Sequence, residues 1–345
     1  MPDGAVISPP VEIHVGALAG WFASRTGADG VHIDPPVLLP GGAVQQNWAL
    51  NVDFAGGQSA GRQRLVLRTN FQTPLPASRP KAEEFAVLRA VAAAGVAVPE
   101  PLWLCEDVRV TGQPFFVMRR LPGDTSARKL VAAAAREGFG SALADRLARE
   151  LALVHALTPD DTRLACMGPP AASSARAQVA QCRDWLTALA PESRILSAGL
   201  DWLERHAPRQ RQTNLVHRDF RSGNFLVENR RLTAVLDWEF AGWGDPHEDI
   251  GWFCAACWRA GGGELEAGGL ATRSAFYRAY EAVSGRKVDA DTVAYWEVMA
   301  HLRWAIIARQ QSARAERGEM PQHELLEAAT RVPGLERDIA AMIAG

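Results

Sequence analysis

The segment Asn214–Phe240, NLVHRDFRSGNFLVENRRLTAVLDWEF, constrains the fold more than any other part of the chain. It starts with a short apolar run, passes through a polar loop, and then holds two apolar runs, Asn224–Val227 and Leu232–Leu236, on either side of a turn. Short apolar runs separated by turn residues are typical of β-strands. The second half of the segment therefore predicts a β-hairpin.

The polar residues of this segment follow a regular pattern. Asp219 stands two residues after His217, Asn224 follows five residues later, and Asp237 ends the predicted hairpin. The hairpin would return Asp237 to the neighbourhood of Asp219 and Asn224. Mg²⁺ prefers hard oxygen ligands and keeps substrate phosphates in its shell, and phosphoryl transfer needs a carboxylate that orients and deprotonates the attacking hydroxyl. The pattern favours phosphoryl transfer; unrelated surface polar groups are the alternative.

The loop and the residues after it resemble a known family. HRDFRSGN is similar to the catalytic loop of protein kinases, H-R-D-L-x-x-x-N. The continuation, LDWEFAGWGDPHEDIGW, resembles the aminoglycoside phosphotransferase family of kinase-like small-molecule phosphotransferases. Within that family it looks closest to the branch related to the phosphotransferase-like domains of acyl-CoA dehydrogenase family members ten and eleven. No long insertion resembling an activation loop separates Asp237 from Asp245, which argues against a switchable protein kinase.

The resemblance runs from Gly41 to the last predicted helix and implies an α+β, two-lobed, protein-kinase-like fold. We expect residues 1–121 to form a nucleotide-binding lobe with a small antiparallel sheet and one main helix. Residues 122–345 would form a larger, mainly helical lobe with the catalytic loop and the acceptor site. Pro122-Gly123 is a typical boundary signal, and 345 residues suffice for two cores.

Hydrophobic periodicity places the individual elements. In the N-terminal part we expect a helix at Ile13–Ser24, a hairpin at Val37–Phe54, strands at Arg64–Thr69, Leu102–Cys105 and Pro114–Gly123, and a helix at Arg79–Gly95. Beyond Thr125 we expect helices at Ser126–Arg136, Ser141–Leu157, Arg176–Ala190, Ser193–His206, Ala267–Ser284, Asp289–Ala315 and Pro321–Ala344.

Glycines at the tip of the first hairpin, Gly41 and Gly42, would let backbone amides approach phosphate oxygens. An ordinary hairpin turn is the alternative. The chain lacks both a G-x-G-x-x-G pattern and a Walker lysine, which disfavours dinucleotide-binding and P-loop folds.

Arg68 occupies the strand position at which kinase-like folds carry a lysine that pairs with the nucleotide phosphates and with a helix glutamate. By the resemblance that glutamate is Glu84, and a surface arginine on an edge strand is the alternative for Arg68. The resemblance also places Met118 at the back of the adenine pocket, with the backbone of Arg119 and Leu121 on the adenine edge. ATP and Mg²⁺ are the implied cofactors.

Roles for the loop residues also follow from the resemblance. Asp219 is the candidate base, and Asn224 and Asp237 are the candidate Mg²⁺ ligands. Arg221 stands where many kinase loops carry a phosphate-contacting lysine, so we expect it to neutralise charge on the transferred group; a solvated arginine is the alternative.

Several neighbouring residues are expected to support this loop. His217 would hold it by hydrogen bonding, and Asp249 resembles a buried aspartate that braces its backbone. Asp245-Pro246 reads as a structural turn, and His155 as a packed helix histidine. Arg218 replaces a glycine that is usual in the family, and the sequence assigns it no role.

Two further patterns resemble binding sites, but packing is the favoured role for each. Cys254-x-x-Cys257, within a predicted helix, supplies too few ligands for zinc. The late tryptophans could line an acceptor groove, but core packing is the favoured role for most of them. They are Trp238, Trp243, Trp252, Trp258, Trp296 and Trp304.

Bulk properties exclude several partner classes. A net charge of −2 does not indicate binding to nucleic acid or to a membrane surface. The N-terminus lacks the pattern of a secretory signal, and no apolar run is long enough to cross a bilayer. The odd number of cysteines, five, favours a reducing cytoplasm over a disulfide framework. The oligomeric state is not predictable from the sequence.

The sequence therefore predicts an enzyme, a phosphotransferase that moves the γ-phosphate of ATP to a hydroxyl of a small molecule. The branch resemblance implies a hydroxyacyl compound such as a hydroxyacyl-CoA as the acceptor. One alternative is an aminoglycoside 3'-type O-phosphotransferase, although a polycation requires an acidic site and the helices beyond Asp289 mix arginines with acids. The other is a nucleotide-binding pseudokinase or regulatory module.

Overall fold

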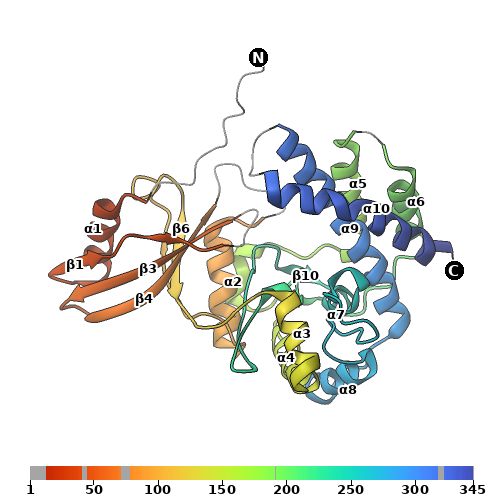
Figure 1. Cartoon of the computed structure of the whole chain (residues 1–345), viewed down its shortest axis with the longest axis horizontal. Helices are drawn as coiled ribbons and strands as arrows, with labels where there is room; N and C mark the ends of the chain where they lie inside the picture. The colour runs from red at the N-terminus through yellow and green to blue at the C-terminus, as the bar shows by residue number, and fades with distance from the viewer. Residues whose placement is uncertain (1–12, 41–44, 71–77, 191, 318–321, 345) are drawn as a thin grey trace.

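An antiparallel six-stranded sheet occupies the N-terminal third of the protein (Figure 1). The computed structural model describes residues 13–40, 45–70, 78–190, 192–317 and 322–344. The strand order is β1-β3-β4-β6-β5, and β2 also pairs with β3. The strands are β1 (Gly30–Ile33), β2 (Val37–Leu38), β3 (Gln45–Ala55), β4 (Gly61–Asn70), β5 (Pro101–Cys105) and β6 (Phe115–Arg119).

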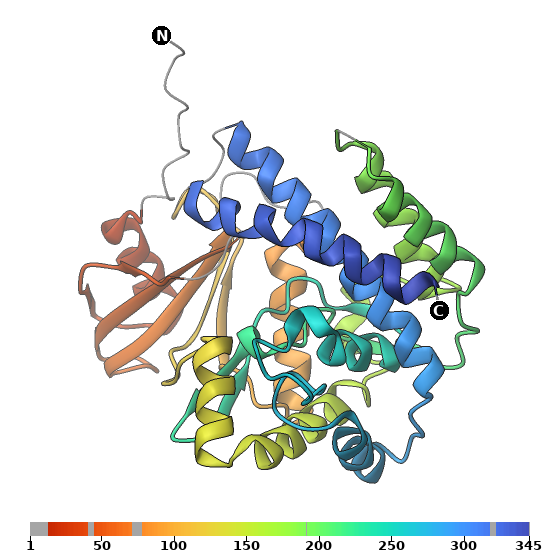
Figure 2. The same ribbon diagram turned by 45° about the vertical axis from the view of Figure 1, so that its right-hand side comes forward.

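Two helices, α1 (Val15–Thr26) and α2 (Lys81–Ala93), cover the two faces of this sheet. Side chains alternate between the faces of a strand, so Phe115 of β6 lies in the core under α1, while Phe116 packs 5.7 Å from the ring of Phe85 on α2. α2 thereby lies between the sheet and the helices that follow (Figure 2).

The rest of the chain is mainly helical. The helices are α3 (Ala127–Glu137), α4 (Gly140–Val154), η1 (Thr162–Met167), α5 (Ser174–Thr187), α6 (Arg194–Arg205), η2 (Ser222–Asn224), α7 (Pro246–Cys254), η3 (Ala256–Trp258), α8 (Arg273–Ser284), α9 (Ala290–Glu316) and α10 (Gln322–Ala344). α9 and α10 run side by side (Figure 2) and share an apolar core with α5 and α6. Sheet and helices together confirm the predicted α+β, kinase-like fold.

Short strands carry the segment on which the sequence analysis centred. They are β7 (Asn214–Val216), β8 (Phe225–Glu228), β9 (Arg231–Val235) and β10 (Gly242–Gly244). β8 and β9 form an antiparallel hairpin, and β7 pairs with β10. The Leu236 N–H donates to the Asn224 carbonyl at 2.8 Å, so the chain entering Asp237 returns to the loop. The predicted hairpin is confirmed.

Some predicted elements need correction. The short strand β1 was not predicted, and the strand expected at Pro114–Gly123 ends at Arg119. The helix expected from Ala267 begins only at Arg273, because Gly268 and Gly269 adopt positive φ angles of 61° and 76°. β2 and β3 pair as the predicted hairpin requires, but Gly41 and Gly42 lie outside the described residues. The lobe boundary at residues 121 and 122 remains a prediction.

All five cysteines are free thiols. The sequence predicts that one helix holds both Cys254 and Cys257, and this prediction is wrong. Cys254 is the last residue of α7, whereas Cys257 lies in η3. Within the described ranges, we find no helix with the length and apolar character needed to span a membrane.

Candidate active site

A cavity of about 750 Å³ opens between the sheet and the helical part. Small-molecule sites usually occupy roughly 300–1,000 Å³. The cavity brings together most of the predicted site residues: Arg68, Glu84, Met118, Arg119, Leu121, Asp219, Arg221, Asn224 and Asp237. His217 and Asp249 lie behind its wall, in the core.

Asp249 holds the polar loop from below. Its two carboxylate oxygens accept the backbone N–H groups of His217 and Arg218, each at 2.7 Å, and His155 Nε2 lies 3.1 Å from Oδ2. Burial alone would raise the pKa of Asp249, but the hydrogen bond and charge of His155 outweigh it, so the pKa is lowered. Arg218 adopts a positive φ of 65° in this loop. Strained backbone of this kind persists where surrounding bonds over-determine it.

His217 uses both ring nitrogens inside the fold. Nε2 lies 2.9 Å from the Leu236 carbonyl, and Nδ1 accepts the Asp219 N–H at 3.2 Å. These partners assign the neutral tautomer with the proton on Nε2. Because His217 is fully buried, it positions the loop and has no nitrogen left for a proton transfer in the cavity.

Asp219 is held by three donors. Asn224 Nδ2 donates to Oδ2 at 2.6 Å, while Trp252 Nε1 and Arg221 Nε donate to Oδ1 at 3.1 and 2.9 Å. The side chain is 9% exposed and lines the cavity. A carboxylate has about four lone-pair sites, so it can still accept a hydroxyl proton in this orientation. Trp252 was not predicted as a partner of Asp219.

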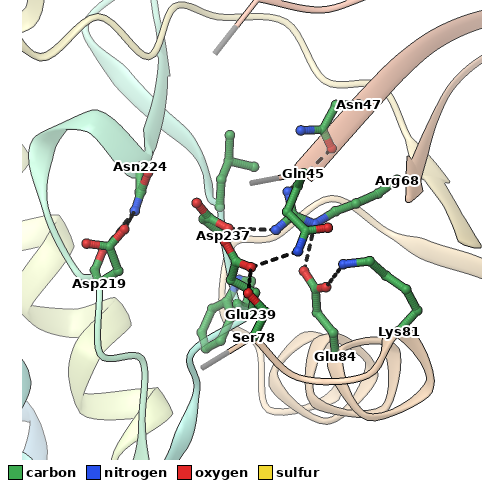
Figure 3. Close-up of polar contacts among 12 residues, drawn as sticks. Gln45, Asn47, Arg68, Ser78, Lys81, Glu84, Asp219, Asn224, Asp237 and Glu239 are labelled. Atoms are coloured by element: carbon green, nitrogen blue, oxygen red, sulfur yellow. Dashed lines mark hydrogen bonds and ion pairs between the residues drawn. The ribbon is translucent and has the colours of Figure 1, made fainter. Parts of the chain in front are cut away.

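One end of the cavity, here called the acidic end, consists of Glu84, Asp237 and Glu239 around Arg68 (Figure 3). Arg68 donates to Glu84 Oε1 at 2.7 Å and to Asp237 Oδ1 at 2.6 Å. Lys81 Nζ donates to the other Glu84 oxygen at 2.6 Å. The Arg68–Glu84 pair that the sequence predicts therefore forms, with a second buried cation behind it.

Charges at the acidic end interact strongly. Burial would raise the pKa of Asp237, but Arg68 more than compensates and lowers it. Burial, followed by the charge of Asp237, raises the pKa of Glu239 to about 7. Glu239 Oε2 accepts from Gln45 Nε2 at 2.7 Å and from the Ser78 hydroxyl. Negative charge is thus in excess at this end.

Asn224 and Asp237 fit a Mg²⁺ ion by the chemistry of their oxygens. Asn224 directs its amide nitrogen to Asp219, which leaves its carbonyl oxygen for another partner. Asp237 has a positive φ of 71° and gives only Oδ1 to Arg68. No group of three or more His, Cys, Asp or Glu side chains suited to a metal occurs in the described part of the chain. Mg²⁺ usually combines one or two carboxylates with substrate phosphates and water.

The end of β6 and the residues just after it line the same cavity with Met118, Arg119 and Leu121. The Arg119 N–H already donates to the Glu100 carbonyl at 3.0 Å. A backbone hydrogen bond between Arg119 and the adenine edge would therefore need the Arg119 carbonyl oxygen as its acceptor.

Two loop arginines take different positions. Arg221 pairs with Asp219, and its guanidinium carbon lies 4.7 Å from the centroid of Trp258. Arg218 Nη2 donates to the Trp243 carbonyl at 2.9 Å. The Nε of the same side chain lies 3.1 Å from Glu248 Oε1, and the two groups form an ion pair without a hydrogen bond. Burial raises the pKa of Glu248.

The other end of the cavity, here called the tryptophan end, is formed by α7, η3 and α9. Its residues are Trp252, Trp258, Arg303, Trp304, Ile307 and Gln311. As expected, most of the late tryptophans pack in the apolar core, namely Trp238, Trp243, Trp252 and Trp296. Trp238 and Trp252 also line the cavity, together with Trp258 and Trp304. Helical spacing in the sequence shows that one face of a helix is apolar. It does not show whether that face packs against other helices or lines a cavity.

Sequence reasoning missed Lys81, Glu248 and Arg303. Lys81 and Glu84 lie three residues apart on α2, a spacing that places them on one helix face and could have predicted their contact. Arg303 had no such signal, because its cavity neighbours come from distant segments.

Comparisons with known proteins agree with this geometry. The model of the phosphotransferase enzyme family matches residues 38–286. Mouse acyl-CoA dehydrogenase family member 10 is 33% identical over 57% of this chain and 18% of its own length, so the chain spans only a small part of that relative. A solved putative aminoglycoside phosphotransferase from Ralstonia eutropha has a TM-score of 0.72 and 22% identity over 96% of this chain and 99% of its own. Aminoglycoside 2'-phosphotransferase-IIIa, solved with GDP, has a TM-score of 0.60 and 15% identity over 94% and 99%.

Proposed function

Because the chain belongs to the phosphotransferase enzyme family, we propose that it transfers the γ-phosphate of ATP to a hydroxyl of a small molecule with the help of Mg²⁺. The observation that carries the proposal is Asp219, a cavity carboxylate fixed by Asn224 and Trp252. Carboxylates of this kind orient and deprotonate the attacking hydroxyl in phosphoryl transfer.

Each proposed role follows from the contacts. Asp219 accepts the hydroxyl proton through one of its oxygens. Asn224 and Asp237 hold Mg²⁺, which when bound neutralises charge on the phosphates. Arg68 lies against Asp237 and would contact the phosphates. Arg221, which neutralises Asp219 in the absence of ligands, would move its charge toward the transferred group.

The remaining predicted contacts belong to the nucleotide. Met118 would lie behind the adenine, with Arg119 and Leu121 at its edge, and Gly41 and Gly42 would cover the phosphates. Free thiols at all five cysteines are consistent with the cytoplasmic location that we propose.

For the acceptor we propose a hydroxyacyl compound such as a hydroxyacyl-CoA, in view of the match to acyl-CoA dehydrogenase family member 10. The alternative acceptor, an aminoglycoside, is favoured by the names of the structural neighbours. Polycations need acidic surroundings, and none of the described residues that line the tryptophan end is acidic. This observation disfavours aminoglycosides.

The test is Mg²⁺-dependent ATP turnover, without acceptor and with a mass-spectrometric screen of hydroxyacyl-CoAs, sugars, amino alcohols and aminoglycosides. We expect Asp219→Ala to lower turnover about 10²- to 10⁴-fold, while Asp184→Ala, an exposed carboxylate on α5, has no effect. GTP replaces ATP in a parallel arm. Nucleotide binding with no turnover under any acceptor would identify a pseudokinase and refute the proposal.

A further inference from the structure

Arg303 is a buried cation for which the described residues provide no acceptor. It is 5% exposed, lines the cavity and makes no hydrogen bond or ion pair with any residue that the structure describes. Its guanidinium carbon instead lies 5.4 Å from the ring centroids of both Phe240 and Trp252. Cation–π contacts offset only part of the cost of burying a charge, and buried charges are normally paired.

Positive charge is in excess around Arg303. Arg218 and Arg221 also line this part of the cavity, and the nearby carboxylates are Asp219 and Glu248, each already paired with one of those two arginines. Burial, followed by the charge of Arg218, lowers the pKa of the Arg303 guanidinium. An additional negative charge is therefore missing at this point.

The surroundings of Arg303 are otherwise apolar. Trp258, Trp304 and Ile307 line the same end, and among the described residues no acceptor reaches the indole N–H of either tryptophan. Flat apolar walls of this kind fit a ligand that has an aliphatic or aromatic body.

We propose that Arg303 is a specificity-determining residue that binds a carboxylate of the acceptor, whose remaining body packs against Trp258 and Trp304. The acceptor would thus be the free acid of an apolar hydroxyacyl compound and not its CoA thioester, which has no carboxylate at the acyl carbon. This inference rests on the proposed phosphotransferase function and names the acceptor class for the same site.

Trp252 relates this carboxylate to the reacting hydroxyl. One indole contacts both groups, because its Nε1 donates to Asp219 while its face meets Arg303. A hydroxyl at Asp219 would therefore lie near the edge of this indole ring, and a carboxylate at Arg303 near its face. Both groups can belong to one compact molecule.

The first experiment measures binding without nucleotide. Titration calorimetry compares 3-hydroxyoctanoate and 4-(hydroxymethyl)benzoate with their uncharged methyl esters. We expect the wild-type protein to bind the acids, Arg303→Met to weaken this binding about 10- to 100-fold, and Arg303→Lys to retain part of it. Neither variant should change binding of the esters. Arg183→Met, which removes an exposed arginine of α5, is the matched control.

The second experiment repeats the comparison as phosphoryl transfer from ATP, with acceptor-independent ATP turnover measured in parallel. Arg303→Met should lower kcat/KM for the acids by the same factor, mainly through KM, whereas kcat/KM for the esters should not change. Equal use of acids and esters by the wild type, use of neither, or an Arg303→Met variant indistinguishable from it would overturn the inference. Preference for a hydroxyacyl-CoA thioester that is insensitive to Arg303 would also overturn it and leave the proposed function intact. No turnover of ATP with any acceptor would refute the proposed function instead.

Discussion

The two ends of the cavity differ in the sign of the charge that they lack. At the acidic end, Glu84, Asp237 and Glu239 surround Arg68, and burial together with the charge of Asp237 raises the pKa of Glu239 to about 7. At the tryptophan end the excess charge is positive, and burial together with the charge of Arg218 lowers the pKa of Arg303.

This difference indicates how the protein divides its work between its own residues and its ligands. The acidic end would be completed by a cation, as the proposed Mg²⁺ site requires. The tryptophan end would be completed by an anion, as the proposed hydroxy acid supplies. Cations at the acidic end are paired within the chain, whereas Arg303 has no ion-pair partner among the described residues. Changes at the two ends should therefore affect stability in opposite directions.

The largest effect is expected for Glu84→Ala. This change leaves Lys81 without its counter-charge and Arg68 with Asp237 as its one remaining partner. The side chains of Arg68, Glu84 and Lys81, here called the buried triad, are each at most 8% exposed. Removing one partner from a buried ion pair costs about 3–5 kcal/mol. Urea denaturation followed by circular dichroism should show this loss in the free energy of unfolding.

The control for that prediction is the preceding residue. Glu83 forms a more exposed pair with Arg79, and exposed pairs contribute about 0–1 kcal/mol, so Glu83→Ala should change stability little. Equal losses in the two variants would show that the acidic end is not organised by the buried triad.

A smaller effect of opposite sign is expected for Arg303→Met. Methionine keeps much of the side-chain volume and removes a buried charge that has no acceptor among the described residues. We expect a gain of about 1 kcal/mol in the free energy of unfolding, measured by the same denaturation. A loss as large as that of Glu84→Ala would mean that Arg303 is held by the fold and would remove the contrast between the two ends.

The smallest effect concerns pH and Glu248, whose pKa is raised by burial above its ordinary value of 4.5. Since the folded state holds this proton more tightly than the unfolded state, the stabilising contribution is complete below pH 4.5. It is lost as pH rises through the folded-state pKa. Glu248→Gln should therefore reduce the fall in stability above pH 4.5, by an amount on the order of 1 kcal/mol.

Thermal denaturation of both proteins from pH 4 to pH 8 measures this difference. The control is Glu316→Gln, which replaces an exposed acid near the end of α9. Its stability should depend on pH in the same way as that of the wild type. If wild type and Glu248→Gln keep a constant offset at all pH values, Glu248 ionises normally, and the tryptophan end holds a full counter-charge.

Local pattern was sufficient to predict the frame of the site. The hairpin after Asn224, the bracing Asp249 and the Arg68–Glu84 pair follow from residue spacing combined with one family resemblance, and the structure contains each of these contacts. Their roles toward ATP and Mg²⁺ stay predictions. The hairpin is visible in the sequence because it depends on short-range order. The contacts of Asp249 with His217 and of Arg68 with Glu84 join residues 32 and 16 positions apart, and the resemblance predicted them.

What the sequence did not predict depends on contacts between distant segments. Glu239 meets Gln45, which lies 194 positions away in the chain, and the environment of Arg303 combines α7, α9 and Phe240. An arginine in an amphipathic helix normally points to solvent, so its burial could not be foreseen. The delayed start of α8 reflects backbone conformation at two glycines, which apolar periodicity does not report.

The hydrogen bonds from the loop to Asp249 also affect how the site can unfold. The amide hydrogens of His217 and Arg218 end on a carboxylate that is itself fully buried. Local fraying occurs where backbone hydrogen bonds are exposed to solvent, whereas the bond from His217 is buried and the bond from Arg218 is partly buried. We therefore expect the loop that carries Asp219 to keep its geometry for as long as the surrounding helices remain folded.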